Sequence, residues 1–245
     1  MVDSKSRSFL KAITWRIFAV ILLMLVSFAL TRSIKTVTYI TLLYHSIQIF
    51  MFYLHEQLWN YIKWGKTRGL FVQMTGLSGA GKTTLAQALA EKLRKQGYKI
   101  EIIDGDEYRE GICKDLGFSK QDRCTNIRRL GFVGKVLARN NVIAIMSAIN
   151  PYDEVRNELT SMGEFVRTVH VKCDIETLKK RDTKGLYARA LLPDGDPNKV
   201  HNFTGISDPF EEPTSADLTI ETNKEEMEAS LKKLHEFVLR EAGSK

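Results

Sequence analysis

Gly76-Leu-Ser-Gly-Ala-Gly-Lys-Thr-Thr84 is the stretch of sequence that decides the fold of this chain. It fits the pattern G-x-x-x-x-G-K-[ST], in which the backbone N–H groups of a glycine-rich loop converge on nucleotide phosphates. An apolar run at residues 69–75 precedes it and predicts a buried strand, and residues 83–94 follow with leucines at helical spacing. This order brings the positive end of a helix dipole to the phosphates. The stretch therefore predicts an α/β fold of the P-loop NTPase type, a parallel sheet flanked by helices.

The same pattern predicts which residues contact ATP. Lys82 is expected to reach the β- and γ-phosphates, and the hydroxyl of Thr83 is expected to bind Mg²⁺. The residues predicted to hold the nucleotide are Gly76, Ser78, Gly79, Ala80, Gly81, Lys82, Thr83 and Thr84. A chance glycine-rich turn is the alternative, but it would not explain why a strand and a helix flank the loop.

The distribution of charge argues against nucleic-acid binding. The 245 residues carry a net charge of +7. Residues 1–68 contain nine Lys or Arg and two acidic residues, which account for the whole excess, so residues 69–245 are neutral. A neutral second part lacks the basic surface that phosphate backbones require. Three cysteines, Cys113, Cys124 and Cys173, have no metal-ligand spacing and are expected to be reduced thiols.

Two apolar stretches precede the glycine-rich loop, at about residues 13–31 and 36–58. Each approaches the roughly 20 residues that a helix needs to cross a bilayer, and the link at residues 32–35 is short. We therefore expect a membrane domain over residues 1–66, containing a transmembrane helical hairpin, and a catalytic domain over residues 67–245. Aromatic residues near the ends of the spans are suited to the membrane interface; they are Trp15, Trp59, Tyr61 and Trp64.

Three other interpretations of these stretches are open. A cleaved signal peptide lacks a clear small-x-small site and would not be followed by a second span. A soluble hairpin lacks an amphipathic stripe. A helix pair lying in the interface is the closer rival, because Arg16, His45 and Gln48 are costly in lipid. Six basic residues flank the outer ends and two lie in the link, which predicts a multi-pass protein of the inner membrane with both termini and the catalytic domain in the cytoplasm, where ATP is found.

Polar residues follow the predicted strands of the second part. The predicted strands are 98–104, 141–149, 165–173 and 218–221. The predicted helices are one that follows residue 129 and ends at about residue 139, one over 175–181 and one over 224–242. The first of these strands ends in Asp104-Gly-Asp106, with Arg109 close behind. Ligands of parallel sheets bind beyond the carboxyl ends of the strands, where two carboxylates can hold Mg²⁺ or accept a proton. An ordinary acidic turn is the alternative, because Asp-Gly is common in turns.

A series of motifs in the second part carries a specific resemblance. They are GLSGAGKTT (76–84), DGD (104–106) with Arg109, GFSKxDRxxNIRR (117–129), NPY (150–152) with Arg156, RDxKGLY (181–187), FTGI (203–206) and DPFEEP (208–213). With them, residues 69–243 resemble the adenylylsulfate kinase family, which uses ATP to phosphorylate the 3′-hydroxyl of adenosine 5′-phosphosulfate (APS), giving PAPS and ADP. Residues 5–16 and 53–65 resemble a small bacterial membrane-domain family of unknown function.

The resemblance implies a role for individual residues. The resemblance implies catalytic roles for Lys82, Asp104, Asp106 and Lys184. Thr83, Asp104 and Asp106 would bind the metal ion, and one of the two aspartates would act as the general base. Arg109 and Arg123 would pair with the phosphosulfate, and Phe118 and Phe203 would sandwich the adenine of APS. Further contacts to APS would come from Asn126, Ile149 and Lys184. Arg181 would contact ATP. The alternative, purely structural roles are core packing for the two phenylalanines and a solvent-exposed helix face for Arg128 and Arg129. The family resemblance also implies a homodimer.

Three features depart from the family pattern. Asn150 stands where the family usually has Ser, which excludes a phosphoseryl intermediate there and favours direct in-line transfer. The lid, a predicted loop that opens at residues 182–187 and runs through residues 202–213, contains a longer stretch at residues 191–199. The predicted strand 141–149 ends without an Asp for Mg²⁺. Two alternative functions stay open at this point: a membrane-anchored kinase of a related small molecule, and a non-catalytic membrane sensor that binds nucleotide.

Overall fold

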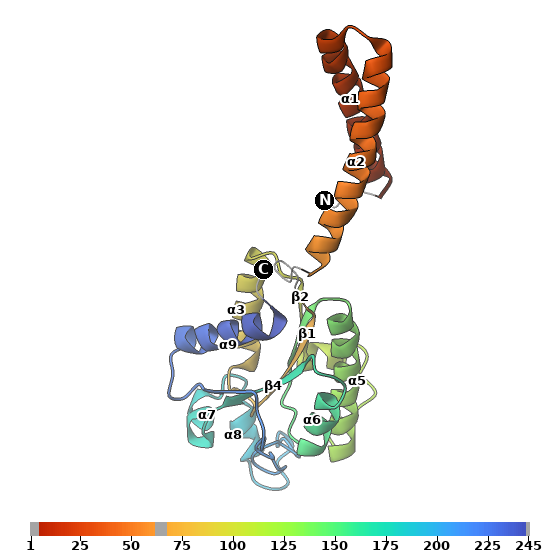
Figure 1. Ribbon diagram of the computed structural model, residues 1–245. Helices are drawn as coiled ribbons and strands as arrows, with labels where there is room; N and C mark the ends of the chain where they lie inside the picture. The colour runs from red at the N-terminus through yellow and green to blue at the C-terminus, as the bar shows by residue number, and fades with distance from the viewer. Residues whose placement is uncertain (1–4, 62–67, 244–245) are drawn as a thin grey trace. The chain divides into compact units, whose positions relative to one another are not determined.

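The computed structural model describes residues 5–61 and 68–243, with side chains for residues 13–58 and 68–243. The chain divides into two compact units, residues 1–64 and 65–245. The first unit is helical and the second contains a sheet (Figure 1). The domain boundary expected between residues 66 and 67 lies outside the described residues, as do the side chains of the expected interfacial aromatics Trp59, Tyr61 and Trp64.

Two antiparallel helices form the first unit (Figure 1). Helix α1 spans Lys5–Thr31 and α2 spans Ile34–Tyr61, so the link is only Arg32 and Ser33, with Arg32 at a left-handed φ of 51°. Both helices are long and apolar enough to cross a membrane, over Ile13–Thr31 and Ile34–Leu58.

A narrow, partly polar seam joins the two helices. Its buried residues are Ser27, Val37 and Thr41, and the Thr41 hydroxyl donates to the Val37 carbonyl at 2.8 Å. Within α2, His45 Nδ1 lies 3.3 Å from Gln48 Oε1. Most of the large apolar side chains on both helices point outward, and Leu30 is 81% exposed. A helix that is apolar all round is typical of a membrane span, so a soluble hairpin would leave most of its apolar surface in water.

Five parallel strands form the sheet of the second unit, in the order β2-β3-β1-β4-β5. The strands are β1 (Leu70–Thr75), β2 (Ile100–Asp104), β3 (Ile143–Ser147), β4 (Val166–Lys172) and β5 (Leu218–Glu221). All six residues of the central strand β1 are buried. Its register places Phe71 beside Ala144 of β3 and Val166 of β4. Because both faces of this sheet are covered, its inner strands appear in the sequence as continuous apolar runs.

Helices cover both faces of the sheet (Figure 1). They are α3 (Lys82–Lys95) and α9 (Met227–Ala242) on one face, and α5 (Lys120–Arg139) and α6 (Asp153–Thr160) on the other. Leu70, Val72 and Met74 of β1 join the core under α3 and α9, while Phe71 joins the core under α5. Helix α5 approaches closely because Gly134 lies against Phe71, where an added Cβ would come within 2.4 Å of the ring.

The architecture confirms the predicted α/β class, with a parallel sheet flanked by helices. The short helices α4 (Gly105–Glu110), α6 and α8 (Leu186–Ala190) were not predicted, because five to eight residues show little periodicity. The equally short α7 (Ile175–Arg181) was predicted. The expectation that the last helix begins at Lys224 is wrong. The backbone N–H groups of Lys224 and Glu225 both donate to the Glu221 carbonyl and close a turn, so α9 begins at Met227.

Candidate active site

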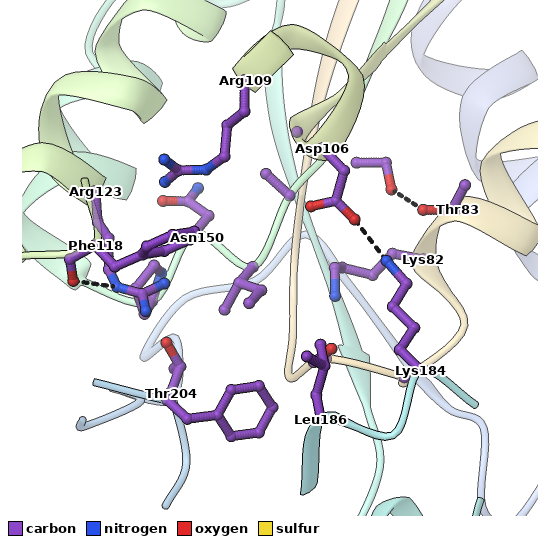
Figure 2. Close-up of a pocket in the computed structure, with 18 of the residues that line it drawn as sticks. Lys82, Thr83, Asp106, Arg109, Phe118, Arg123, Asn150, Lys184, Leu186 and Thr204 are labelled. Atoms are coloured by element: carbon purple, nitrogen blue, oxygen red, sulfur yellow. Dashed lines mark hydrogen bonds and ion pairs between the residues drawn. The ribbon is translucent and has the colours of Figure 1, made fainter. Parts of the chain in front are cut away.

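A pocket of about 430 Å³ opens at the carboxyl ends of the strands, the edge where α/β sheets bind their ligands. It is lined by the glycine-rich loop and the start of α3, the ends of β2 and β3, parts of α4 and α5, and two stretches of the lid, 183–186 and 200–204. Figure 2 shows Lys82, Thr83 and Lys184 on one side of this pocket and Arg109, Phe118 and Arg123 on the other. A phosphate-binding loop and an arginine-rich wall therefore face the same cavity.

The glycine-rich loop wraps around the amine of Lys82. Its Nζ donates to the carbonyls of Gly76 and Leu77 at 2.9 and 2.8 Å. Gly76 has a φ of 150°, and a Cβ there would lie 2.2 Å from the Val171 carbonyl oxygen, so the loop requires glycine at this position. Burial lowers the pKa of Lys82 to about 8, against the opposing effect of Asp106. A phosphate entering the loop would supply the negative charge that this buried amine lacks.

Thr83 stands at the start of α3 beside a second hydroxyl and a carboxylate. Its Oγ1 lies 3.0 Å from both Asp104 Oδ2 and Ser147 Oγ. Ser147 ends β3 in register with Asp104 at the end of β2. Hydroxyl and carboxylate oxygens are ligands that Mg²⁺ accepts, together with water and nucleotide phosphates. The described residues contain no cluster of three His, Cys, Asp or Glu side chains that could hold a metal by itself.

The two aspartates of the DGD motif have different surroundings. Asp104 caps α4, with its Oδ1 accepting from the backbone N–H groups of Asp106 and Glu107, and its Oδ2 accepts from Thr83. Asp106 is exposed to the pocket, and its carboxylate pairs with Lys184 Nζ of the lid at 2.5 Å (Figure 2). Asp104 is therefore held in place by three donors, whereas Asp106 reaches into the cavity and pairs with an exposed lysine.

The opposite wall combines guanidinium groups with an exposed ring. Phe118 is 57% exposed, and the guanidinium carbons of Arg109 and Arg123 lie 4.6 and 5.5 Å from its ring centroid. Arg123 donates to the carbonyls of Phe118 and Asn202, and Arg109 donates to the carbonyl of Gly117. Burial and the neighbouring Arg123 lower the pKa of Arg109, which stays a cation. This wall suits a ligand that is both aromatic and anionic.

Phe203 enters the pocket from the lid but is only 6% exposed. Its ring meets Tyr187 edge-on, with centroids 5.0 Å apart. Phe118 is thus an open face for stacking, while Phe203 belongs to both the core and the pocket lining.

Three buried oxygens on the pocket wall have no hydrogen-bond donor among the described residues. They are Asn126 Oδ1, Asn150 Oδ1 and Thr204 Oγ1, each on a side chain at most 4% exposed. A buried polar atom without a partner costs free energy, so these atoms favour a ligand that donates hydrogen bonds. Asn150 adopts a left-handed φ of 45°, and its amide nitrogen donates to Gln73 Oε1 at 3.0 Å. Asn126 was a predicted substrate residue. Thr204, although it lies in the FTGI motif, and Ser147, at the end of β3, were not predicted.

Some of the expected site residues lie away from the pocket surface. Gly76, Ala80 and Arg181 do not line it, and Arg181 donates to the Thr222 carbonyl at 2.8 Å. The helix-face interpretation fits Arg128 and Arg129. Arg128 pairs with Glu158 and Glu154, and Arg129 pairs with Asp115, all on the surface. The expected substrate residue Ile149 does line the pocket, as do Ser78, Gly79, Gly81 and Thr84.

Two family models match this chain. The model described as "Adenylylsulphate kinase" matches residues 68–221, more than half of the chain. The model described as "Predicted membrane protein (DUF2061)" matches residues 9–60, which include both apolar stretches.

Individual proteins with the same description are similar over most of their own length. An "Adenylyl-sulfate kinase" of Picosynechococcus sp. is 49% identical over 168 residues, covering 68% of this chain and 92% of the relative. One of Chloroflexus aurantiacus is 50% identical over 155 residues, covering 63% of this chain and 81% of the relative. The solved Mycobacterium tuberculosis APS kinase CysC in complex with AMPPNP and APS is 32% identical, with a TM-score of 0.64 over 71% of this chain and 98% of that one.

Proposed function

Because the chain belongs to the adenylylsulphate kinase family, we infer that it is an adenylyl-sulfate kinase, which transfers the γ-phosphoryl group of ATP to the 3′-hydroxyl of APS. The products are PAPS and ADP, as in sulfate activation. The observation that carries this function is the two-sided pocket, in which the phosphate loop and an arginine-phenylalanine wall converge on Asp106 and Lys184. A pure nucleotide sensor would have no need of the second wall.

The ATP side is proposed to work by positioning and charge neutralisation, which dominate phosphoryl transfer. Lys82 holds the β- and γ-phosphates, and the glycine-rich loop donates its backbone N–H groups to them. Thr83 and Asp104 would hold Mg²⁺, with Ser147 beside them, and the ion would neutralise phosphate charge. Lys184 would leave Asp106 and approach the transferring group when the lid receives ATP, since a phosphate competes for the same ammonium.

The APS side is proposed to bind the acceptor through its two kinds of group. Arg109 and Arg123 pair with the phosphosulfate, and Phe118 offers its open face to the adenine, with Phe203 at the lid. Asn126 and Thr204 offer buried acceptors to hydrogen-bond donors of the nucleoside. Asp106 accepts the proton of the 3′-hydroxyl, because its carboxylate is the freer of the two in the pocket.

Formation of PAPS by the full-length protein tests this function. In detergent micelles with ATP, Mg²⁺ and APS, we expect production of PAPS and ADP in equal amounts, measured by ion-pair chromatography. Removing Mg²⁺ with excess EDTA is expected to reduce the rate at least about 100-fold, because the phosphate charge is then left uncompensated. Adenosine 5′-phosphate and simple sugars are tested in place of APS as phosphoryl acceptors. Faster transfer to one of these than to APS would favour the kinase of a related molecule, and tight nucleotide binding without any transfer would favour the sensor.

We further propose that α1 and α2 cross the inner membrane and leave the kinase unit in the cytoplasm. The support is the outward apolar surface of both helices, the match to a predicted membrane protein family, and the bias of basic residues towards the outer ends. The homodimer implied by the family resemblance stays a prediction.

Labelling of single cysteines tests this orientation. In intact cells, a membrane-impermeant maleimide is expected to label Ser33→Cys in the short link but not Ser161→Cys on the exposed surface of the kinase unit. After the cells are opened, Ser161→Cys should react. Retention in the membrane after alkaline carbonate washing would separate a spanning hairpin from an interfacial one. Labelling of both positions only in opened cells would contradict the proposed crossing.

A further inference from the structure

Tyr187 lies beneath the pocket, outside the set of residues expected to touch a substrate. It is the second residue of α8 and is 2% exposed. Two lid residues that line the pocket, Lys184 and Leu186, come just before it in the chain. Asp182 holds this segment by accepting the backbone N–H groups of Tyr187 and Ala188 at 3.0 and 2.9 Å. Tyr187 is therefore fixed in the same short segment as these two pocket-lining residues.

The hydroxyl of Tyr187 bonds the nucleotide loop. It donates to the backbone carbonyl of Ser78 at 2.9 Å, across 109 positions of sequence. Burial raises the pKa of Tyr187 to about 12, so the hydroxyl stays a donor at neutral pH. Ser78 stands inside the loop that surrounds Lys82, and a shift of its peptide would move the N–H groups that hold phosphate.

The ring of Tyr187 contacts the acceptor side. It packs edge-on against Phe203 at 5.0 Å, and both rings belong to the main core cluster. The carbonyl of Phe203 accepts from the backbone N–H groups of Ile206, Ser207 and Asp208. The ring is therefore fixed to a tight loop over residues 203–208 of the lid, which we call the acceptor loop. A second contact joins the same loop to the nucleotide loop, because Leu77 lies against Gly205, where an added Cβ would be 2.7 Å away. One side chain thus touches the nucleotide loop, the lid and the acceptor loop.

We propose that Tyr187 is a positioning residue that couples ATP binding to APS binding, through its hydroxyl on Ser78 and its ring on Phe203. Ordering of the phosphate loop by nucleotide then orders the lid and the acceptor loop, so that the second ligand meets a preformed site. Tyr187 does not line the pocket itself. The proposal rests on the proposed function, because APS is the ligand whose affinity is coupled.

Titration calorimetry on the full-length protein in detergent micelles tests the coupling. The dissociation constant of APS is measured alone and with saturating AMPPNP, and the ratio of the two values is the coupling factor. We expect AMPPNP to tighten APS binding in the wild type, and Tyr187→Phe to lower the coupling factor by about three- to tenfold, the effect of one buried hydrogen bond. The separate affinity for AMPPNP is expected to change by less than about twofold. Tyr98→Phe is the matched control, since it removes another buried tyrosine hydroxyl, far along the chain from the lid, that donates to the Gly243 carbonyl at 3.5 Å.

Each outcome of this experiment is decisive. A lower coupling factor in Tyr187→Phe, with Tyr98→Phe unchanged, supports the proposal. A coupling factor near one in the wild type, or an equal factor in wild type and Tyr187→Phe, overturns it. Equal weakening of both ligands together with a lower unfolding temperature would show a merely structural role and would also overturn it. If the wild type binds no APS and forms no PAPS, both the proposed function and the proposed coupling are wrong. If the wild type forms PAPS but shows no coupling through Tyr187, only the role of Tyr187 is wrong.

Discussion

Replacing Asp106 with asparagine is expected to lower kcat for PAPS formation by about 100-fold or more, while the dissociation constant of AMPPNP changes by less than about threefold. Asparagine keeps the size of the side chain but cannot hold a proton from the attacking hydroxyl. The assignment favours Asp106 over Asp104 because Asp104 is occupied by the α4 cap and by Thr83. Asp106 pairs with Lys184 of the lid and lines the pocket. Initial rates with saturating ATP and APS measure the effect.

Glu107→Gln is the matched control for this variant. Glu107 is the next residue of α4, is exposed and does not line the pocket, so the same change of charge is expected to leave kcat within about twofold. If Asp106→Asn retained kcat within about threefold, the base would have to be Asp104 or water, and the assignment to Asp106 would be wrong.

Replacing Lys82 with methionine is expected to lower kcat/KM for ATP by about 1,000-fold, which corresponds to about 4 kcal/mol of transition-state stabilisation. The same substitution is expected not to destabilise the folded protein in the absence of nucleotide. Burial lowers the pKa of Lys82 from 10.5 to about 8, so the charged amine disfavours the folded state. That cost is fully present below pH 8, decreases as pH rises towards 10.5, and is absent above it, because only the unfolded chain binds the proton in this window. Methionine has similar length and no charge to bury.

Thermal unfolding followed by circular dichroism separates these two effects. At pH 7, ligand-free Lys82→Met is expected to unfold at a temperature equal to or above that of the wild type, and saturating Mg·AMPPNP should raise the unfolding temperature of the wild type only. Lys92→Met on the exposed side of the same helix is the control, with rates within about twofold of wild type. A lower unfolding temperature of Lys82→Met without nucleotide would contradict this expectation. It would show that the hydrogen bonds from Lys82 to the loop carbonyls stabilise the fold by more than the burial of its charge destabilises it.

The parts of the fold that could be predicted are those with a local pattern. The β1 strand, the phosphate loop and α3 were predicted together because the motif joins a buried run to a helical repeat, and the two long apolar helices were predicted from length and composition. The short helices α4, α6 and α8 were missed, since a helix of five to eight residues depends on its caps and its contacts more than on periodicity. Asp104 forms such a cap, and the sequence alone could equally place it in an acidic turn.

The candidate site divides in the same way. The phosphate loop with Lys82 and Thr83 could be predicted from the sequence, because backbone capture of phosphate requires glycines at fixed spacing along one continuous segment. The three-dimensional fold was needed to show that Thr83 donates to Asp104, that Asp106 pairs with Lys184 of the lid, that Ser147 faces Thr83, and that Tyr187 reaches Ser78. These contacts join residues tens of positions apart, and they depend on strand order, register and the path of the lid. No local spacing encodes such contacts, since they form only when the parallel strands bring their carboxyl ends to one edge of the sheet.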